Sequence, residues 1–213
     1  MLKRSLLALT APTVFMALTA TSLFLTGCKE SPSTGSGSSA TEKSASAPVS
    51  IAAIAAEATG FTVGSPMSAR TVYVFFDAQC PHCGELWRTA KPLKAQAKFI
   101  WIPVGILNAA STSQGATLLA SKDPVALMDE HEASILSKGS GISSASDIAA
   151  QKDAVAKNTQ LLNRFGFASI PTIVGTHAET GALVTHEGSM STAALAALLG
   201  LKSSDGEAQP PAR

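Results

Sequence analysis

Cysteine is scarce in this sequence, and its scarcity excludes a disulfide-stapled scaffold. Only 3 of the 213 residues are cysteine, too few for the paired framework of small disulfide-rich domains. Aromatic residues make up 5% of the chain and hydrophobic residues 46%, which suits a globular core. The formal net charge is +1, so there is no excess of cations of the kind that binds nucleic acid. We expect one globular domain with appendages and no nucleic-acid partner.

A single long hydrophobic run lies near the N-terminus. It spans residues 6–25 and follows Lys3 and Arg4, the order of an export signal. The run ends at Leu25-Thr26-Gly27-Cys28, which resembles the lipobox of bacterial lipoproteins, where the cysteine is lipidated after cleavage. An uncleaved membrane anchor of about 20 residues is the alternative. We expect a signal peptide at 1–27 and lipidation at Cys28, and Lys29 after the cysteine implies sorting to the outer membrane.

The rest of the chain divides by composition. Residues 28–47 are rich in Ser, Gly and Ala, which predicts a flexible tether. Residues 48–69 predict a linker helix and a loop, residues 70–201 a catalytic domain, and residues 202–213 a disordered tail.

The hydrophobic patterning predicts an α/β fold. We expect strands at 71–76, 99–104, 170–174 and 182–185, and helices at 48–60, 85–97, 113–120, 123–136, 147–165 and 192–199. From residue 71 the order is β-α-β, three helices, β-β-α. That is the arrangement of a thioredoxin fold with a helical insertion between its βαβ and ββα halves.

The cysteine pair of this chain is Cys80-Pro81-His82-Cys83, which follows the first predicted strand and opens a helix. A helix start supplies free N–H groups and a positive dipole end, and both stabilise a thiolate. The thiolate is the attacking form in disulfide exchange. We therefore predict Cys80 as the nucleophile and Cys83 as the resolving thiol.

Other uses of two cysteines fit less well. Structural zinc needs four ligands, and no histidine lies at a paired spacing, so we expect no metal and no cofactor. Attachment of c-type haem requires histidine after the second cysteine, where this chain has Gly84. A copper(I)-binding module remains an alternative, because soft thiolates select that ion.

Several further residues are candidates for the site. His82 lies where its N–H or charge stabilises the Cys80 thiolate, unless it only faces solvent. Asp77 either accepts the proton of Cys83 or caps the following turn. By contrast, we expect His131 to be a solvated helix residue.

The Ile170-Pro171 pair opens the strand after the insertion, where the thioredoxin fold has a cis-proline. By that analogy we expect a cis bond, with Pro171 positioning the substrate and the backbone of Ile170 pairing with an extended substrate chain.

Taken together, these residues resemble the DsbC/DsbG family of bacterial periplasmic thiol:disulfide interchange proteins, and its DsbG branch most closely. The resemblance runs from about Thr71 to Leu201. It rests on the strand before the cysteines with Asp77, on Trp87 and Pro92, on the segments 120–124 and 132–134, and on Pro171.

The resemblance implies an enzyme, a thiol:disulfide oxidoreductase or isomerase acting on exported cysteine-containing proteins. It also implies a membrane thiol partner of the DsbD or DsbB kind and a periplasmic location, here lipid-anchored. Family members carry an N-terminal dimerisation domain, for which the 42 residues from Lys29 to Arg70 leave too little room, so we expect a monomer. The Pro81-His82 dipeptide is that of the oxidase DsbA, so a DsbA-like oxidase remains an alternative, whereas Ile170 is the choice of thioredoxin and points toward a reductant.

Overall fold

The computed structural model of the protein describes residues 46–202. The predicted signal peptide at 1–27, the predicted lipidation site Cys28, most of the tether at 28–47 and all but the first residue of the predicted tail lie outside the described residues.

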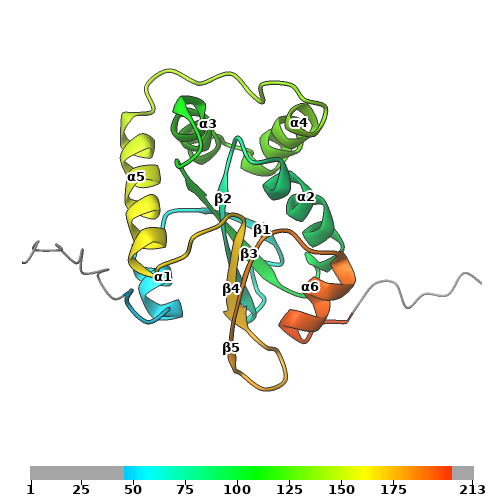
Figure 1. The fold of residues 1–213 in the computed structure, drawn as a ribbon. Coiled ribbons are helices and arrows are strands. Elements are labelled where there is room, and N and C mark those ends of the chain that lie inside the picture. The colour runs from blue at the N-terminus through cyan, green and yellow to red at the C-terminus, as the bar shows by residue number, and fades with distance from the viewer. Residues whose placement is uncertain (1–45, 203–213) are drawn as a thin grey trace, which may run out of the picture. The chain divides into compact units, whose positions relative to one another are not determined.

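The described chain forms a mixed sheet with helices on both faces (Figure 1). The strands are β1 (Phe61–Gly64), β2 (Thr71–Asp77), β3 (Lys98–Val104), β4 (Thr172–Thr176) and β5 (Leu183–Glu187). The helices are α1 (Ile51–Glu57), α2 (Pro81–Ala90), α3 (Ala109–Ala120), α4 (Pro124–Leu136), α5 (Ala149–Arg164) and α6 (Thr192–Leu199), with a 3-10 turn η1 (Lys91–Leu93). The strand order is β1-β3-β2-β4-β5. Strands β2 and β3 are parallel and the other pairs are antiparallel.

The predicted α/β fold and the order of elements from residue 71 are confirmed. Helices α2 and α6 lie on one side of the sheet and α1, α3 and α5 on the other, while α4 packs against α2 (Figure 1). The three helices of the predicted insertion, α3, α4 and α5, follow β3 in sequence.

Strand β1 was not predicted from the sequence. Its four residues pair antiparallel with β3, so that Phe61 lies opposite Trp101. The segment 48–69 was expected to be a linker helix and a loop. Its helix packs on the domain, as shown by the full burial of Ile54 and by the contact of α1 with α5.

Local sequence signals determine where several helices begin and end. The Asp123 side chain accepts a hydrogen bond from the Ala126 N–H at 3.0 Å, as expected of an N-cap before a proline at the first helical position. Pro92 lies in the η1 turn, so the helix predicted over 85–97 already ends at Ala90. Helix α3 begins four residues earlier than predicted, because Asn108 and Ser111 form a capping box.

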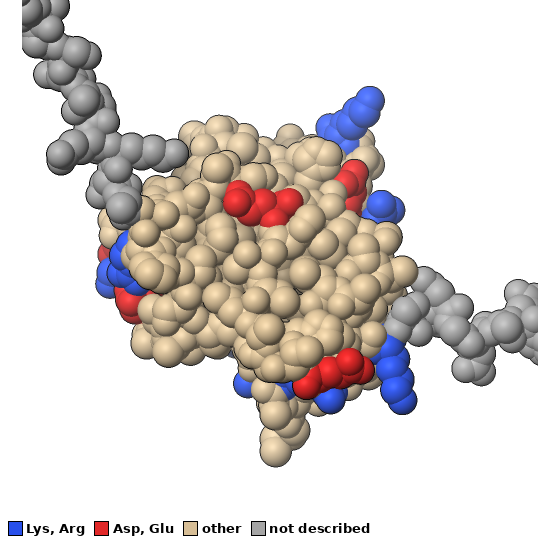
Figure 2. All heavy atoms as spheres, turned by 60° about the horizontal axis from the view of Figure 1, so that its bottom comes forward, with Lys and Arg blue, Asp and Glu red and all other residues tan. Residues whose placement is uncertain are grey.

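The charged side chains of the surface are mixed in sign. On the face seen in Figure 2, Lys and Arg lie along the rim close to Asp or Glu, and most of the surface belongs to other residues. This face therefore offers no broad patch of one charge.

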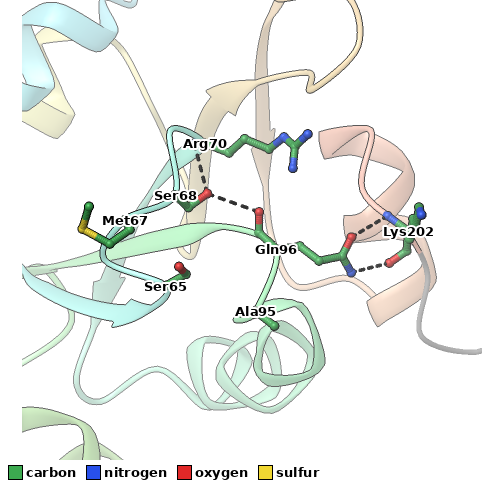
Figure 3. A pocket seen from close by; sticks show the side chains of 7 residues that line it. All are labelled: Ser65, Met67, Ser68, Arg70, Ala95, Gln96 and Lys202. Carbon is green, nitrogen blue, oxygen red and sulfur yellow. Dashed lines mark hydrogen bonds between the residues drawn. The ribbon is translucent and has the colours of Figure 1, made fainter.

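A shallow hollow of about 650 Å³ lies at the start of β2 (Figure 3). Its lining includes Arg70, Gln96 and Lys202. The Gln96 side chain bonds the backbone N–H and carbonyl of Lys202 at 2.9 and 2.8 Å. Because the cysteine pair follows the other end of β2, this hollow is separate from the candidate redox site.

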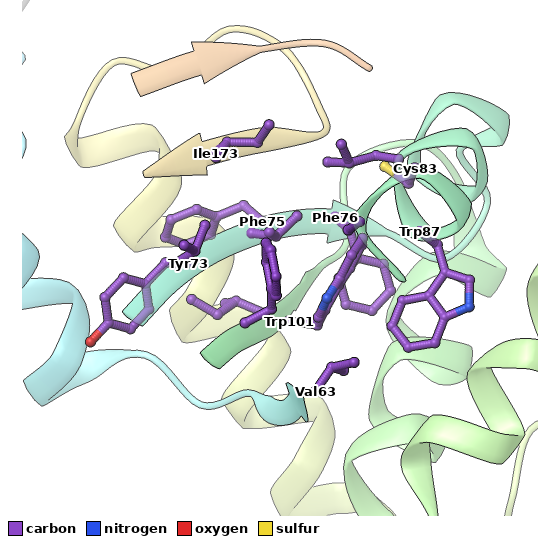
Figure 4. Close-up of a cluster of buried hydrophobic side chains, with 14 of the residues drawn as sticks. Val63, Tyr73, Phe75, Phe76, Cys83, Trp87, Trp101 and Ile173 are labelled. Carbon is purple, nitrogen blue, oxygen red and sulfur yellow. The ribbon is translucent and has the colours of Figure 1, made fainter. Parts of the chain in front are cut away.

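The part of the core between the sheet and α2 contains a group of aromatic side chains (Figure 4). The Trp87 and Trp101 rings meet edge to face with centroids 4.9 Å apart, and Phe76 meets Trp101 at 5.5 Å, a favourable geometry for aromatic pairs. The buried Cys83 belongs to the same cluster. The apolar packing thus fixes the first turn of α2 in place.

Candidate functional site

The cysteine pair lies where the central strand β2 passes into α2. Cys80 is the N-cap residue of α2, and Pro81 occupies the first helical position, which suits a residue without an N–H. The N–H of Cys80 donates to the Asp77 carbonyl and the N–H of Cys83 to the Cys80 carbonyl, both at 3.0 Å. Both cysteines are therefore held at the start of the helix, as predicted.

The two thiols differ in burial and in acidity. Cys80 is 6% exposed and Cys83 is fully buried, and both are free thiols. A hydrogen bond from the Cys83 thiol lowers the pKa of Cys80 to about 7; burial opposes this, and the backbone N–H groups of Cys83 and His82 and the His82 charge add to it. Burial, together with the neighbouring Cys80, raises the pKa of Cys83 well above 9.0. Near neutral pH, Cys80 therefore supplies a thiolate while Cys83 keeps its proton.

His82 lies on the surface beside this pair. Its Nδ1 is 3.0 Å from Oε2 of Glu85, and this hydrogen bond raises the pKa of His82. Glu85 also accepts a hydrogen bond from Ser189 Oγ at 2.9 Å. The imidazolium is thus favoured near the Cys80 sulfur, where its charge helps to stabilise a thiolate.

The Ile170-Pro171 bond is cis, as predicted. The Cys80 thiol points at the Ile170 carbonyl, with Sγ and O 3.9 Å apart. Glu187 of β5 holds this loop by accepting the N–H groups of Ala168 and Ser169 at 2.9 and 2.7 Å. The structure therefore brings residues 90 positions apart in sequence to one site.

Asp77 caps the turn that leads to the cysteines, which was one of its two predicted roles. One carboxylate oxygen accepts the Gln79 N–H at 2.8 Å. The other accepts the N–H groups of Ile106 and Leu107 at 2.8 and 3.0 Å. Asp77 thus ties the loop after β3 to the start of the site.

The expectation of a solvated His131 is wrong. The ring is fully buried, with Nε2 2.5 Å from the Ala78 carbonyl and Nδ1 accepting the Ile142 N–H at 3.1 Å. This arrangement requires the proton on Nε2, and burial lowers the pKa of His131, so the ring stays neutral. His131 therefore supports the turn two residues before Cys80.

Glu132 is a second residue of the site that the sequence reasoning missed. It is 1% exposed, and burial raises its pKa to about 8, with the Cys80 charge adding to the rise. A helical pattern contains a signal for both residues, because His131 and Glu132 follow Met128 by three and four positions and so share its buried face.

The described residues hold no group of three or more His, Cys, Asp or Glu placed to bind a metal. Within residues 46–202, no helix has both the length and the apolar character needed to cross a membrane.

Comparison with known proteins agrees with this geometry. No protein-family model matches the chain. The chain is 35% identical over 136 residues to the thiol:disulfide interchange protein DsbG of Pseudomonas aeruginosa, a match that covers 62% of this chain and 51% of that protein. DsbG of Escherichia coli is 37% identical over 65 residues, 30% of this chain and 26% of that protein. The chain is therefore similar in sequence to part of these DsbG proteins.

The chain spans about half the length of the Pseudomonas relative and less of the Escherichia coli one. Solved structures confirm the thioredoxin-like fold. The catalytic domain of Proteus mirabilis ScsC matches at a TM-score of 0.54 and 14% identity, covering 70% of this chain and 96% of that one. A periplasmic thioredoxin-like protein from Salmonella enterica serovar Typhimurium gives 0.55 and 13%, covering 72% and 97%. The thiol-disulfide exchange protein α-DsbA2 of Wolbachia pipientis gives 0.53 and 19%, covering 66% and 86%.

Proposed function

We propose that this protein is a thiol:disulfide oxidoreductase of the interchange type. The supporting observation is that the two thiols differ in acidity. Cys80 has a pKa of about 7 at a helix start, while the fully buried Cys83 retains its proton. A pair of thiols whose environments separate their acidities suits a two-step exchange.

The exchange has two displacements. The Cys80 thiolate attacks one sulfur of a substrate disulfide, forms a mixed disulfide and releases the first substrate thiolate. Cys83 loses its proton, attacks the Cys80 sulfur and releases the second substrate thiolate, which leaves a Cys80–Cys83 disulfide. Two electrons pass from the protein to the substrate, and the reverse sequence oxidises a substrate dithiol.

The cis-Pro171 loop is the proposed substrate platform. The backbone of Ile170 lies next to Cys80, so an extended chain pairing with it would bring its sulfur to the nucleophile. Pro171 positions this backbone, His82 favours the thiolate, and Asp77 holds the turn.

The acidity of Cys80 favours interchange or reduction over strong oxidation. A pKa of about 7 is close to that of thioredoxin, whereas the oxidase DsbA has about 3.5. We expect a potential between about −180 mV, as for an interchange enzyme, and about −270 mV, as for a reductase, rather than a value of about −120 mV, as for DsbA. Equilibration with glutathione measures it, and a value near that of DsbA would support the alternative oxidase function.

The decisive test of the exchange uses single cysteine variants with a disulfide-containing model protein. Cys83→Ser should accumulate a mixed disulfide on Cys80, because the resolving thiol is absent. Cys80→Ser should accumulate none, since the remaining thiol is buried and protonated. Mass spectrometry of the trapped species checks both, and a stable adduct on Cys83 in the Cys80→Ser variant would refute the assigned roles.

We also propose a periplasmic location with a lipid anchor at Cys28 in the outer membrane, exported cysteine-containing substrates and a membrane thiol partner of the DsbD or DsbB kind. The DsbG relatives and the lipobox-like Leu25-Thr26-Gly27-Cys28 support this proposal. Cys28→Ala should abolish incorporation of labelled palmitate. Persistent labelling would contradict the anchor.

A further inference from the structure

Glu132 is a buried carboxyl group without a partner. The residue is 1% exposed, and neither of its oxygens has a hydrogen-bond partner among the described residues. Buried carboxyl groups are normally paired, because an unpaired one loses its hydration without compensation. Neither the capping nor the packing of α4 explains why a carboxyl group is buried at this position.

The carboxyl lies against the first turn of α2. A Cβ atom built on Gly84 would lie 2.2 Å from Oε2 of Glu132, so only a glycine admits the carboxyl at this distance from the helix backbone. Gly84 directly follows Cys83. Because Gly84 has no side chain, the Glu132 carboxyl lies directly against the α2 backbone, at the residue next to the resolving thiol.

The thiols are the titratable groups coupled to Glu132. The Cys80 charge acts on Glu132, and the Glu132 charge acts on Cys83. Its neighbours on α4 are engaged elsewhere: Asp129 accepts the Trp87 indole N–H and pairs with Lys91, and His131 bonds the Ala78 carbonyl. Both oxygens of Asp77 are occupied by backbone N–H groups.

We propose that Glu132 is the proton acceptor for Cys83 in the resolution step. This inference rests on the proposed exchange function and adds a residue to it. In the mixed disulfide, the Glu132 carboxylate takes the proton of the Cys83 thiol, directly or through one water. The Cys83 thiolate attacks the Cys80 sulfur, and the substrate sulfur leaves with the electron pair of the broken bond. In the reverse direction, the Glu132 acid returns the proton to Cys83.

The charge on Cys80 determines at which stage of the exchange Glu132 can accept a proton. Burial and the Cys80 thiolate together hold the pKa of Glu132 near 8, so the free reduced enzyme keeps Glu132 mostly neutral at pH 7. Once Cys80 enters a mixed disulfide its negative charge is gone, and that part of the rise disappears. Glu132 then ionises more readily at the stage where Cys83 needs a base.

The test separates the two displacements with oxidised glutathione as the probe. The reduced full-length protein is mixed with excess oxidised glutathione and quenched in acid, and mass spectrometry follows glutathionylated Cys80 and then the internal disulfide. Glu132→Gln keeps the shape of the side chain and removes the base. Glu130→Gln makes the same change on the exposed side of the same helix and serves as the control.

We expect Glu132→Gln to change the rate of Cys80 glutathionylation by less than about twofold. At pH 7 it should lower the rate of resolution by about 10²-fold, the usual scale of general-base catalysis. The deficit should shrink above pH 9, where hydroxide ionises Cys83 without help. Unchanged resolution, or one slowed by the same factor at every pH, would refute the role of Glu132. If Glu132→Gln does not fold, the pH dependence of the resolution rate in the wild type is the test. A rate that rises only with ionisation of Cys83 itself would overturn the proposal. Formation of neither glutathionylated Cys80 nor the Cys80–Cys83 disulfide in the wild type would instead refute the exchange function.

Discussion

At the scale of single residues, the reactivity of Cys80 depends more on its partner thiol than on the histidine beside it. The hydrogen bond from Cys83 is the largest cause of its lowered pKa, and the His82 charge is the smallest of those named. The imidazole is turned outward to Glu85. The His82 side chain, between the two cysteines, therefore contributes less to the lowered pKa of Cys80 than the Cys83 thiol does.

This ranking predicts the order of three variants. Cys83→Ala should raise the pKa of Cys80 from about 7 towards its ordinary value near 9.0, because the thiol donor is lost. Cys83→Ser should raise it less, since a hydroxyl still donates, and His82→Ala should raise it less than Cys83→Ala. The pH dependence of iodoacetamide alkylation at Cys80, followed by mass spectrometry, measures all three. A larger effect of His82→Ala would contradict the ranking.

The residues of the cysteine motif and Pro171 were predictable from sequence, whereas those behind them were not. Cys80, Cys83 and Pro171 belong to short patterns that identify a thioredoxin-type site. His131 and Glu132 are brought to the site only by the packing of α4 on α2. Their spacing from Met128 indicates a shared helix face, but only the tertiary contacts show that this face is buried.

At the scale of secondary structure elements, Asn158 of α5 joins three parts of the domain. Its Oδ1 accepts the Thr59 N–H at 2.9 Å, and its Nδ2 donates to the carbonyls of Thr59 and Pro103 at 2.8 and 2.9 Å. The side chain is fully buried. Helix α5 is therefore fastened both to the segment before β1 and to β3.

We expect Asn158→Ala to lower the free energy of unfolding by about 2 kcal/mol or more, because the variant leaves buried backbone groups without partners. Asn163→Ala, on the exposed side of the same helix, should change it by less than about 0.5 kcal/mol. Urea unfolding followed by tryptophan fluorescence compares the two. Equal effects of the two substitutions would show that the Asn158 hydrogen bonds do not stabilise the domain.

Elements with strong local signals were predicted well, and short edge elements were not. The capping pair Asp123-Pro124 identified the start of α4, whereas α2 ends at Ala90, just before Pro92, and not at residue 97 as predicted. Strand β1 has only four residues and follows a helix closely, so its pattern is too short to distinguish from a loop. Its strand structure comes from pairing with β3.

At the scale of the whole molecule, Glu132 should make stability depend on pH. Its pKa is raised from 4.5 to about 8 in the folded state, so the folded protein binds a proton that the unfolded chain releases between these values. The stabilisation is complete below pH 4.5 and is lost as pH rises towards 8.

The difference between the wild type and Glu132→Gln isolates this contribution. Between pH 5 and pH 7, the free energy of unfolding of the reduced wild type should fall by about 2 to 3 kcal/mol relative to the variant. Urea titrations of both proteins under reducing conditions at the two pH values measure it. A difference that stays constant with pH would mean that Glu132 titrates normally in the folded state.

Both ends of the described chain leave the domain away from the cysteines. Ala47 donates its N–H to the carbonyl of Arg164, at the last turn of α5, and Lys202 is bonded to Gln96, just before β3 begins. Cys80 follows the opposite end of the parallel pair β2 and β3 (Figure 1). A domain held by either end would thus present its sulfurs outward, so a fusion partner or solid support joined at these points should leave access for bulky clients unobstructed.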